Sequence, residues 1–287
     1  MARNNPEDRR MSQPIIVEAH GARIPALGLG TFRSEGQACV DAVLEALRVG
    51  YRHVDTAAMY GNEAEVGEGL RVAGLPRDEV FVTTKVWWTD IAPGALQASA
   101  EASLKKLGLH HVDLLHIHWP NPEIPLADSL GALCDAKRRG LARHIGVCNF
   151  PIALLDEAVR LCDEPLVALQ CEYHPTLSQH RLLAEARRHG LAFTSYSPIG
   201  KGTDTEEKVV QEIAVAHGKT GAQVVLRWHV QQDGVIAIPK SSHPVRIQQN
   251  YDIWDFSLGD EEMAAISRMA RPDGRMINPA FAPQWDS

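Results

Sequence analysis

The sequence lacks the features that mark membrane, secreted and disulfide-linked proteins. No apolar run approaches the roughly 18 residues that a membrane span requires. The first residues, MARNNPEDRRMSQP, are polar and charged, without the apolar stretch of a secretory signal. The 5 cysteines are odd in number and include no CxxC pair, which favours a reducing compartment over a disulfide framework. We therefore expect a cytoplasmic protein that does not bind membranes.

Long blocks of like charge are also missing, and so is the glycine pattern of dinucleotide-binding sheets. The net charge is −7, and no run of lysine and arginine is long enough to form a nucleic-acid patch. The GLG at residues 28–30 is not followed by a GxGxxG motif, which argues against a Rossmann fold. Nucleic acid is therefore not an expected partner. If the protein binds an anion, a few local side chains must supply the positive charge.

What the chain does contain is a regular alternation of short apolar runs with longer amphipathic segments. Its 287 residues suit one α/β barrel, and no linker interrupts them. We expect a disordered tail over residues 1–13 and a single domain over 14–287. Eight nearly continuous apolar runs, separated by helix-like segments, predict a parallel (β/α)₈ barrel, the TIM barrel. The runs are ALGLG, RHVD, VFVTTKV, DLLHIH, HIGVCNF, LVALQCE, LAFTSYS and GVIAIP.

Features at both ends of the chain add detail to this barrel. IIVEAHGARIP reads as an N-terminal β-hairpin that turns at His20 and Gly21, ahead of the first barrel strand. TGAQ at 220–223 and SLGD at 257–260 have the spacing of N-terminal capping boxes. The segment DEEMAAISRMA predicts an auxiliary C-terminal helix beyond those the barrel needs.

Polar side chains occupy the carboxyl end of nearly every predicted strand. In a (β/α)₈ barrel these ends converge on one pocket. Each residue alone could be a helix cap or a rim residue, but together they are hard to explain by packing. Tyr60 lies just beyond the second strand. The seven strand-end residues are Asp55, Lys85, His118, Asn149, Gln170, Tyr196 and Lys240.

Four of these side chains are suited to proton transfer. A phenol with a pKa near 10 is a poor acid or base at neutral pH, and an ammonium beside it lowers that pKa. Lys85 is the candidate ammonium for Tyr60, and Asp55 would keep that lysine charged and in place. His118 could orient a carbonyl group or share the proton. The set predicts a proton donor with its tuning groups and no nucleophile.

These residues stand in motifs that resemble the aldo-keto reductases over almost the whole chain. The motifs, in family order, are GYRHVDTAAMYGNE, TTKVW, VDLLHIHWP, HIGVCNF, ALQCEYHP, TSYSPIG and IPKSSHPVRIQQN. Short loops at 120–125 and 200–205 and the tail NPAFAPQWD look most like bacterial members that reduce 2,5-diketo-gluconate, methylglyoxal and other α-dicarbonyls. The resemblance implies NADPH-dependent reduction of small aldehydes, ketones and α-dicarbonyls to alcohols by a monomer.

The resemblance also implies a role for each matched residue. Tyr60 would be the general acid, tuned by Lys85 and Asp55, and His118 would bind the substrate oxygen. Trp87, Trp119 and Pro120 would line the substrate pocket. No metal is implied. The expected cofactor-binding residues are Asn149, Cys148 and Gln170 at the nicotinamide carboxamide, Tyr196 on its ring, Lys240, Ser241 and Arg246 at the 2′-phosphate, and Gln249 and Asn250 at the adenine.

The basic residues of this clamp also have support from the chain itself. Lys240 and Arg246 fall within one strand-to-helix loop of an otherwise acidic protein, which is a plausible phosphate site. The alternative is that both are solvated surface cations.

Two positions depart from the family pattern. Cys148 stands where a serine is usual, and a thiol is a weaker hydrogen-bond donor. It is either a small buried cysteine or a thiol of redox significance beside the nicotinamide. His116 stands where an aliphatic residue is usual, and we expect it to point into the barrel as a hydrogen-bonded core histidine.

Two other functions stay open at this stage. Paired histidines on a barrel strand, here HIH at 116–118, also occur in metal-dependent amidohydrolases. Those sites need further histidines and an aspartate at strand ends that here carry Asn149, Gln170 and Tyr196. The second alternative is a nicotinamide-binding regulatory protein on the same fold, because a fold does not determine a function.

Overall fold

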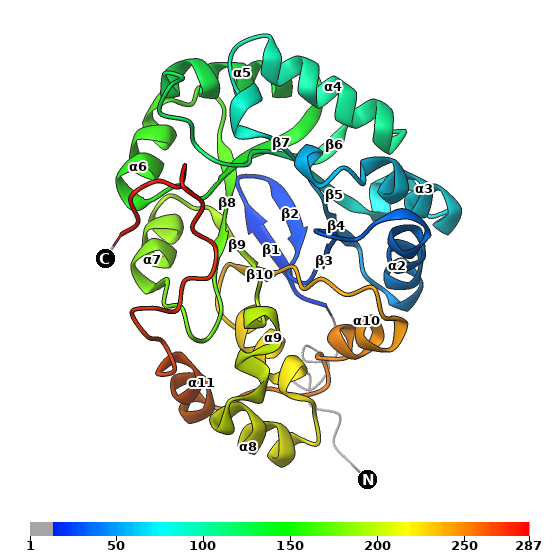
Figure 1. Ribbon diagram of the computed structural model, residues 1–287, viewed down its shortest axis with the longest axis vertical. Helices are drawn as coiled ribbons and strands as arrows, with labels where there is room; N and C mark the ends of the chain where they lie inside the picture. The colour runs from blue at the N-terminus through cyan, green and yellow to red at the C-terminus, as the bar shows by residue number, and fades with distance from the viewer. Residues whose placement is uncertain (1–13, 287) are drawn as a thin grey trace.

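Eight parallel strands form the centre of the computed structural model, which describes residues 14–286 (Figure 1). Their order in the sheet follows their order in the chain, so each strand pairs with its sequence neighbours. All eight predicted runs form strands, as expected for near-continuous apolar segments buried on both faces. The strands are β3 (Leu29–Gly30), β4 (His53–Asp55), β5 (Phe81–Val86), β6 (Val112–Ile117), β7 (Ala142–Cys148), β8 (Leu166–Glu172), β9 (Ala192–Tyr196) and β10 (Val235–Ala237).

The sheet closes on itself between its first and last strands. Leu27 pairs with Ala237 and Gly30 pairs with Lys240, both in parallel register. The Gly28 and Gly30 N–H groups donate to the carbonyls of Ala237 and Pro239 at 2.9 and 3.0 Å. A side chain at Gly30 would meet the Ile238 carbonyl oxygen at 2.7 Å, so the seam needs glycine there. The predicted (β/α)₈ barrel is confirmed.

Helices cover the outside of the barrel (Figure 1). Their apolar residues recur at helical spacing and face the sheet, as in α2, where Cys39, Val43 and Ala46 are buried. None of the helices among the described residues is long and apolar enough to cross a membrane. The α-helices are α2 (Gly36–Val49), α3 (Glu63–Ala73), α4 (Ala95–Leu107), α5 (Leu126–Arg138), α6 (Ile152–Leu161), α7 (His180–Arg188), α8 (Lys208–His217), α9 (Gly221–Val230), α10 (Pro244–Tyr251) and α11 (Asp260–Ser267).

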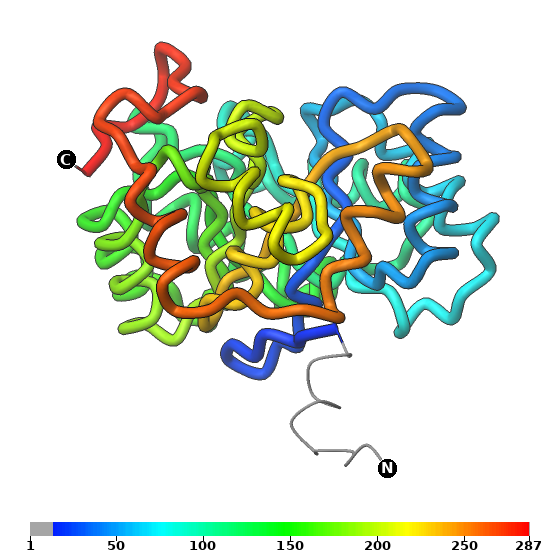
Figure 2. The backbone as a smooth tube through the Cα atoms, turned by 90° about the horizontal axis from the view of Figure 1, so that it is seen from below, coloured from blue at the N-terminus to red at the C-terminus, as the bar shows by residue number. Residues whose placement is uncertain are grey.

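The N-terminal hairpin lies across one end of the barrel, and the C-terminal segment lies at the other (Figure 2). The hairpin strands are β1 (Ile16–Ala19) and β2 (Ala22–Pro25). His20 and Gly21 have φ angles of 45° and 85°, which a two-residue turn of this kind requires. The predicted hairpin is therefore confirmed. The expected disorder of residues 1–13 falls outside the described residues.

One of the two predicted capping boxes forms as expected. Thr220 caps α9 by accepting from the Gln223 N–H at 3.3 Å, and Gln223 Oε1 accepts the Thr220 N–H at 2.9 Å. The box predicted at 257–260 is wrong, because α11 is capped two residues later than expected. Gly259 is the N-cap, and Glu262 Oε2 accepts its N–H at 2.8 Å. The auxiliary C-terminal helix itself is α11.

His116 lies inside the barrel, but the prediction that it is hydrogen-bonded is wrong. Its side chain is fully buried, and neither ring nitrogen has a hydrogen-bond partner within the described part of the chain. The ring packs against Gly146 on β7, where a Cβ would meet its Nδ1 at 2.8 Å. Burial lowers the pKa of His116 to about 3, so this imidazole is neutral. It fills the interior as an apolar ring would.

Candidate active site

A buried ammonium–carboxylate pair stands at the carboxyl ends of β4 and β5. Lys85 Nζ donates to Asp55 Oδ1 at 2.5 Å, to the Thr56 carbonyl at 2.8 Å and to Tyr60 Oη at 3.3 Å. The Lys85 and Asp55 side chains are 0% and 1% exposed. Tyr60 ends a short 3₁₀ turn, Ala58–Tyr60, that leads from β4 towards α3. The structure therefore brings together three of the four residues expected to handle the proton.

Burial and charge act in opposite directions on this group. Burial alone would lower the pKa of Lys85, but the charge of Asp55 raises it above its usual value, so the ammonium persists. Burial raises the pKa of Tyr60 to about 12, although Lys85 lowers it. The expectation that Lys85 brings the phenol below its ordinary pKa therefore does not hold, because burial outweighs the ammonium. Tyr60 is a phenol with its proton in place at neutral pH.

His118 completes the group from the end of β6. Its ring meets the Tyr60 ring edge-on, with centroids 5.7 Å apart. Burial, and then the nearby Lys85 charge, hold the pKa of His118 well below its usual range. Its buried Nδ1 has no hydrogen-bond partner among residues 14–286. The ring is therefore neutral, with unused hydrogen-bonding capacity beside the phenol.

Two amide side chains hold the next strand ends in place. Asn149 adopts a left-handed φ of 63°, and its Nδ2 donates to the His118 carbonyl at 2.9 Å. Its Oδ1 accepts from the Tyr196 hydroxyl at 2.8 Å. Gln170 Nε2 donates to Asp55 Oδ2 at 2.9 Å, which links this amide to the pair of Asp55 and Lys85. Cys148 is fully buried, and burial raises the pKa of its thiol well above the usual value.

The residues expected to clamp a phosphate lie at the barrel seam and at the start of α10. Lys240 and Arg246 are exposed, and neither forms an ion pair within the described residues. Pro244 is the first residue of α10, so Arg246 lies in the first turn, near its unpaired N–H groups. The remaining residues of this set differ in exposure. Ser241 is partly buried, Gln249 is exposed and Asn250 is buried.

Aromatic side chains form the wall around this group. Trp87 meets the His118 ring edge-on at 5.2 Å, and Trp119 and Pro120 are buried beside it. Sequence reasoning did not identify Phe281, whose ring stacks on Trp88 at 4.6 Å and also meets Trp87 and Trp119. Phe32, whose ring lies 5.0 Å from that of Tyr60, was missed as well. Both belong to loops without a periodic pattern that could have shown which way they face.

A second buried charge group anchors the C-terminal segment that carries Phe281. Glu172, at the end of β8, accepts the Met276 and Ile277 N–H groups at 2.8 and 3.0 Å. His174 lies between Glu172 and Asp204, with its ring nitrogens 3.2 and 3.0 Å from their carboxylate oxygens. Buried side chains therefore anchor the segment that carries Phe281. Sequence reasoning placed none of these residues in the site.

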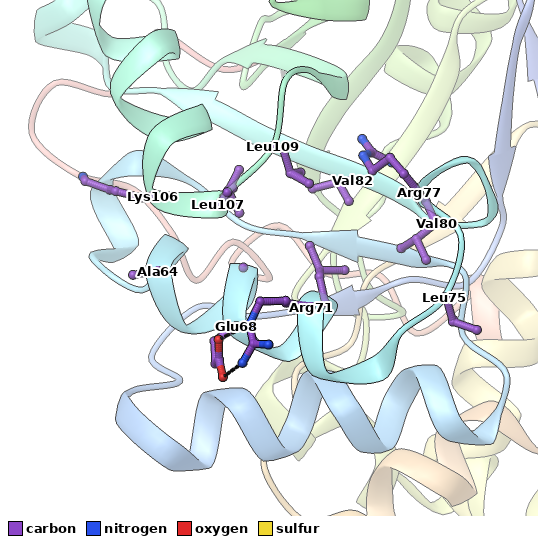
Figure 3. Close-up of a pocket in the computed structure, with 13 residues that line it drawn as sticks. Ala64, Glu68, Arg71, Leu75, Arg77, Val80, Val82, Lys106, Leu107 and Leu109 are labelled. Atoms are coloured by element: carbon purple, nitrogen blue, oxygen red, sulfur yellow. Dashed lines mark hydrogen bonds and ion pairs between the residues drawn. The ribbon is translucent and has the colours of Figure 1, made fainter.

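Two cavities at the surface are not lined by Asp55, Tyr60, Lys85 or His118. A cavity of about 340 Å³ lies between α3 and α4, lined by leucine and valine with Arg71, Arg77 and Lys106 around it (Figure 3). A second, of about 330 Å³, lies behind Phe281 against residues 120–126. Only the second adjoins the aromatic wall. The cavity between α3 and α4 lies on the outside of the barrel.

Within residues 14–286, one group of side chains could share a metal ion. It comprises Asp156, Glu185 and His189, outside the barrel. Arg188 already contacts all three, so its guanidinium occupies that position. His116 and His118 are not in such a group, and the amidohydrolase alternative gains no support from this geometry.

Comparison with known proteins agrees with the architecture and with the motifs. The sequence profile of the Aldo/keto reductase family matches residues 26–271. A methylglyoxal reductase DkgA of Yersinia pestis is 43% identical over 264 residues, which cover 90% of this chain and 93% of that protein. A 9,11-endoperoxide prostaglandin H2 reductase of Trypanosoma cruzi is 41% identical over 254 residues, covering 87% and 89% of the two chains.

Solved structures are equally similar. A crystal structure of a protein provisionally assigned as 2,5-diketo-D-gluconic acid reductase B superposes with a TM-score of 0.95 at 47% identity, covering 96% of this chain and 99% of the other. A Bombyx mori aldo-keto reductase in complex with NADP superposes with a TM-score of 0.87 at 33% identity, covering 93% and 96%. Fold, motifs and overall similarity therefore agree: this chain belongs to the aldo/keto reductase family.

Proposed function

We propose that this protein reduces small, activated carbonyl compounds to alcohols, with NADPH as the hydride donor and Tyr60 as the general acid. The observation that carries the proposal is the hydrogen-bonded series Tyr60, Lys85, Asp55. It presents a protonated phenol beside the rings of Phe32 and His118, backed by an ammonium that stabilises the phenolate once the proton has left. The buried pair keeps that ammonium charged.

The residues present fit a dinucleotide that carries a 2′-phosphate. NADPH, when bound, supplies the hydride that the carbonyl carbon receives. Asn149 and Gln170 offer amides for its carboxamide, and Tyr196 is held by Asn149 where a ring could stack on it. Lys240 and Arg246 supply unpaired positive charge to a phosphate, next to the N-terminus of α10. Ser241 and Cys148 lie beside these groups in the chain, and Gln249 and Asn250 follow on α10.

In the proposed reaction, this chain's own residues position the carbonyl and protonate its oxygen. The neutral His118 ring donates a hydrogen bond to the carbonyl oxygen, while Tyr60 Oη delivers a proton to the same atom. The resulting phenolate is stabilised by Lys85 at 3.3 Å and regains its proton from solvent. Trp87, Trp119 and Phe281 exclude water around the reacting carbon.

The proton donor is tested by Tyr60→Phe. General acid catalysis contributes about 10²–10⁴-fold, so kcat should fall by that factor while the Kd for NADPH stays unchanged. Tyr251→Phe is the matched control, because its ring contacts Tyr51 and Trp254 rather than Lys85. Turnover close to that of the unmodified protein in Tyr60→Phe would refute the assignment. NADPH binding without turnover on any activated carbonyl would instead favour the regulatory alternative.

The cofactor preference is tested by Arg246→Ala. Two charge-assisted hydrogen bonds at about 1.5–3 kcal/mol each imply a preference for NADPH over NADH on the order of 10²–10⁴-fold. The substitution should raise the Kd for NADPH much more than that for NADH, as measured by quenching of tryptophan fluorescence. Arg268→Ala, at the C-cap of α11, removes the same charge elsewhere and should change neither Kd. Equal affinities of the unmodified protein for both cofactors would show that this loop is not a phosphate clamp.

The proposed substrate class rests on the aromatic side chains beside Tyr60 and His118 and on the length of the neighbouring loops. The rings of Phe32 and His118 lie beside Tyr60, Trp87 lies against His118, and the loops at 120–125 and 200–205 are short. We expect methylglyoxal and diketo-sugar acids to have the highest kcat/KM in a panel that includes simple aldehydes and a steroid ketone. A steroid ketone ranking first would overturn this assignment of the substrate class.

A further inference from the structure

Two of the five cysteines lie in contact on the outer layer of the barrel. Cys134 is in α5, and Cys162 is the C-cap of α6, the helix that packs next to α5 (Figure 1). Their Sγ atoms are 3.3 Å apart, although the residues are 28 positions apart in the chain. All five cysteines are free thiols. The two sulfur atoms need to approach by only about 1.3 Å to reach the length of a disulfide bond.

The surroundings of this pair favour a thiolate. The hydrogen bond from the Cys162 thiol, with smaller contributions from the backbone of Glu164 and Asp163, lowers the pKa of Cys134 against the opposing effect of burial. The same hydrogen bond raises the pKa of Cys162, so Cys134 is the thiol of the pair that ionises first. Lys137 and Arg138 place positive charge on the same helix end, and Lys137 Nζ is 2.7 Å from Glu164. A thiolate so stabilised is the reactive form of cysteine.

The other three cysteines have neither a thiol partner nor a lowered pKa. Burial raises the pKa of Cys39 and raises that of Cys171 to about 12. Cys148 is also raised by burial, well above its usual value. All three are fully buried, whereas Cys162 is partly exposed and connects the pair to solvent. Solvent access through Cys162 and a lowered pKa at Cys134 are therefore found in one pair of touching thiols.

We propose that Cys134 and Cys162 form a reversible redox site, which a hydroperoxide oxidises to a disulfide that ties α5 to α6. A thiolate of the pair attacks one oxygen of the hydroperoxide. The O–O bond breaks, and the leaving alkoxide takes a proton from the second thiol. The second sulfur then attacks the resulting sulfenic acid, the S–O bond breaks, and hydroxide leaves as water with the proton released when the first thiolate formed.

Electrons and atoms balance in this sequence. Two thiols and one hydroperoxide give one disulfide, one alcohol and one water, so two electrons pass from sulfur to oxygen. The bond would close the segment from Cys134 to Cys162, which contains β7 and Asn149. This proposal does not depend on the proposed carbonyl reduction, because it involves none of those side chains.

The test uses the unmodified protein, reduced, desalted and treated with one equivalent of hydrogen peroxide at pH 7. Denaturation with a thiol-alkylating reagent then counts the free thiols, which should fall from five to three and return to five with dithiothreitol. Trypsin should release residues 107–137, with Cys134, linked to residues 161–181, with Cys162 and Cys171. Fragmentation of the linked peptides should place the bond at Cys162.

Variants and competing thiols make the outcome decisive. Cys134→Ser and Cys162→Ser should each lose the linked peptides, whereas Cys39→Ser should keep them and fall from four thiols to two. The pair should react with hydrogen peroxide at least about tenfold faster than Cys39, Cys148 and Cys171. Those three thiols have raised pKa values and are almost entirely protonated at pH 7. Five thiols remaining while added glutathione is consumed in parallel would overturn the proposal. First oxidation at Cys148 or Cys171, or unlinked sulfinic acid at Cys134, would also overturn it.

Discussion

Replacing Glu172 by glutamine should release the C-terminal segment that supports the pocket wall. The Glu172 carboxylate is fully buried and accepts two backbone N–H groups, from Met276 at 2.8 Å and Ile277 at 3.0 Å. Glutamine can accept only one of them, and its own NH₂ group then faces the other. One charge-assisted bond is lost, at about 1.5–3 kcal/mol. This corresponds to a shift of roughly 10- to 150-fold in the opening of the segment.

Hydrogen exchange measures that opening directly. In Glu172→Gln the Met276 and Ile277 amides should exchange faster by that factor, while the amides of β6 keep their protection. Glu207→Gln is the matched control, because it removes an exposed carboxylate that pairs with Arg271 at the base of the same segment. Unchanged exchange at residues 276 and 277, with β6 also unchanged, would show that Glu172 does not hold the segment. Faster exchange everywhere would indicate global destabilisation instead.

Three further predictions concern other buried groups. Lys85→Met should lower the free energy of unfolding by about 3–5 kcal/mol, since it strands the buried Asp55, and the double variant with Asp55→Asn should cost less in urea titrations than the sum of the two single changes. Burial alone would lower the pKa of His174, but its hydrogen bonds to Asp204 and Glu172 raise it. The contribution of protonated His174 to the free energy of unfolding is then full below the unfolded pKa of about 6.5 and is lost as pH rises through the raised pKa. The difference in free energy of unfolding between the unmodified protein and His174→Gln should therefore narrow from pH 6 to 9. A difference that widens over this range would contradict the prediction. Gly146→Ala should destabilise by about 1–3 kcal/mol, because its Cβ would meet the Ala168 carbonyl at 2.5 Å and the His116 ring at 2.7 Å; adding His116→Ala should relieve only part of this, and an unchanged urea midpoint would refute it.

The barrel and the proximity of Asp55, Lys85 and His118 were predictable because both follow from local patterns. Parallel strands buried on both faces read as apolar runs, and their carboxyl ends must meet at one edge. Asp55, Lys85 and His118 lie at such ends, so their proximity needed no knowledge of the loops. The hairpin turn at His20 and Gly21 was equally local.

The rest depended on distances that no pattern encodes. Whether Lys85 or burial decides the pKa of Tyr60 depends on how much water the folded pocket admits. Glu172 reaches Met276 across 104 positions of the chain, and Cys134 reaches Cys162 across 28. The His116 ring packs against Gly146 on another strand, which has no side chain to offer a hydrogen bond. Such contacts follow from tertiary packing, which short periodic patterns in the sequence do not predict.

The distribution of charge in the candidate site suits the roles proposed for each group. Lys85 and Asp55 are fully buried and paired, so neither is a free charge in a medium of low dielectric constant. Glu172 and Asp204 both contact His174, and Arg275 Nη1 lies 3.8 Å from Glu172. Lys240 and Arg246, in contrast, are exposed and without ion-pair partners in the described chain. A group that acts on a reacting atom gains from a dry setting, where each interaction is stronger, and needs a fixed counter-charge to remain ionised there. A group that recognises a soluble phosphate must meet it in water, and a permanent carboxylate partner would compete with that anion. The unpaired cations at the seam therefore suit the phosphate recognition proposed for them, and the paired Lys85 inside the barrel suits the proposed proton transfer.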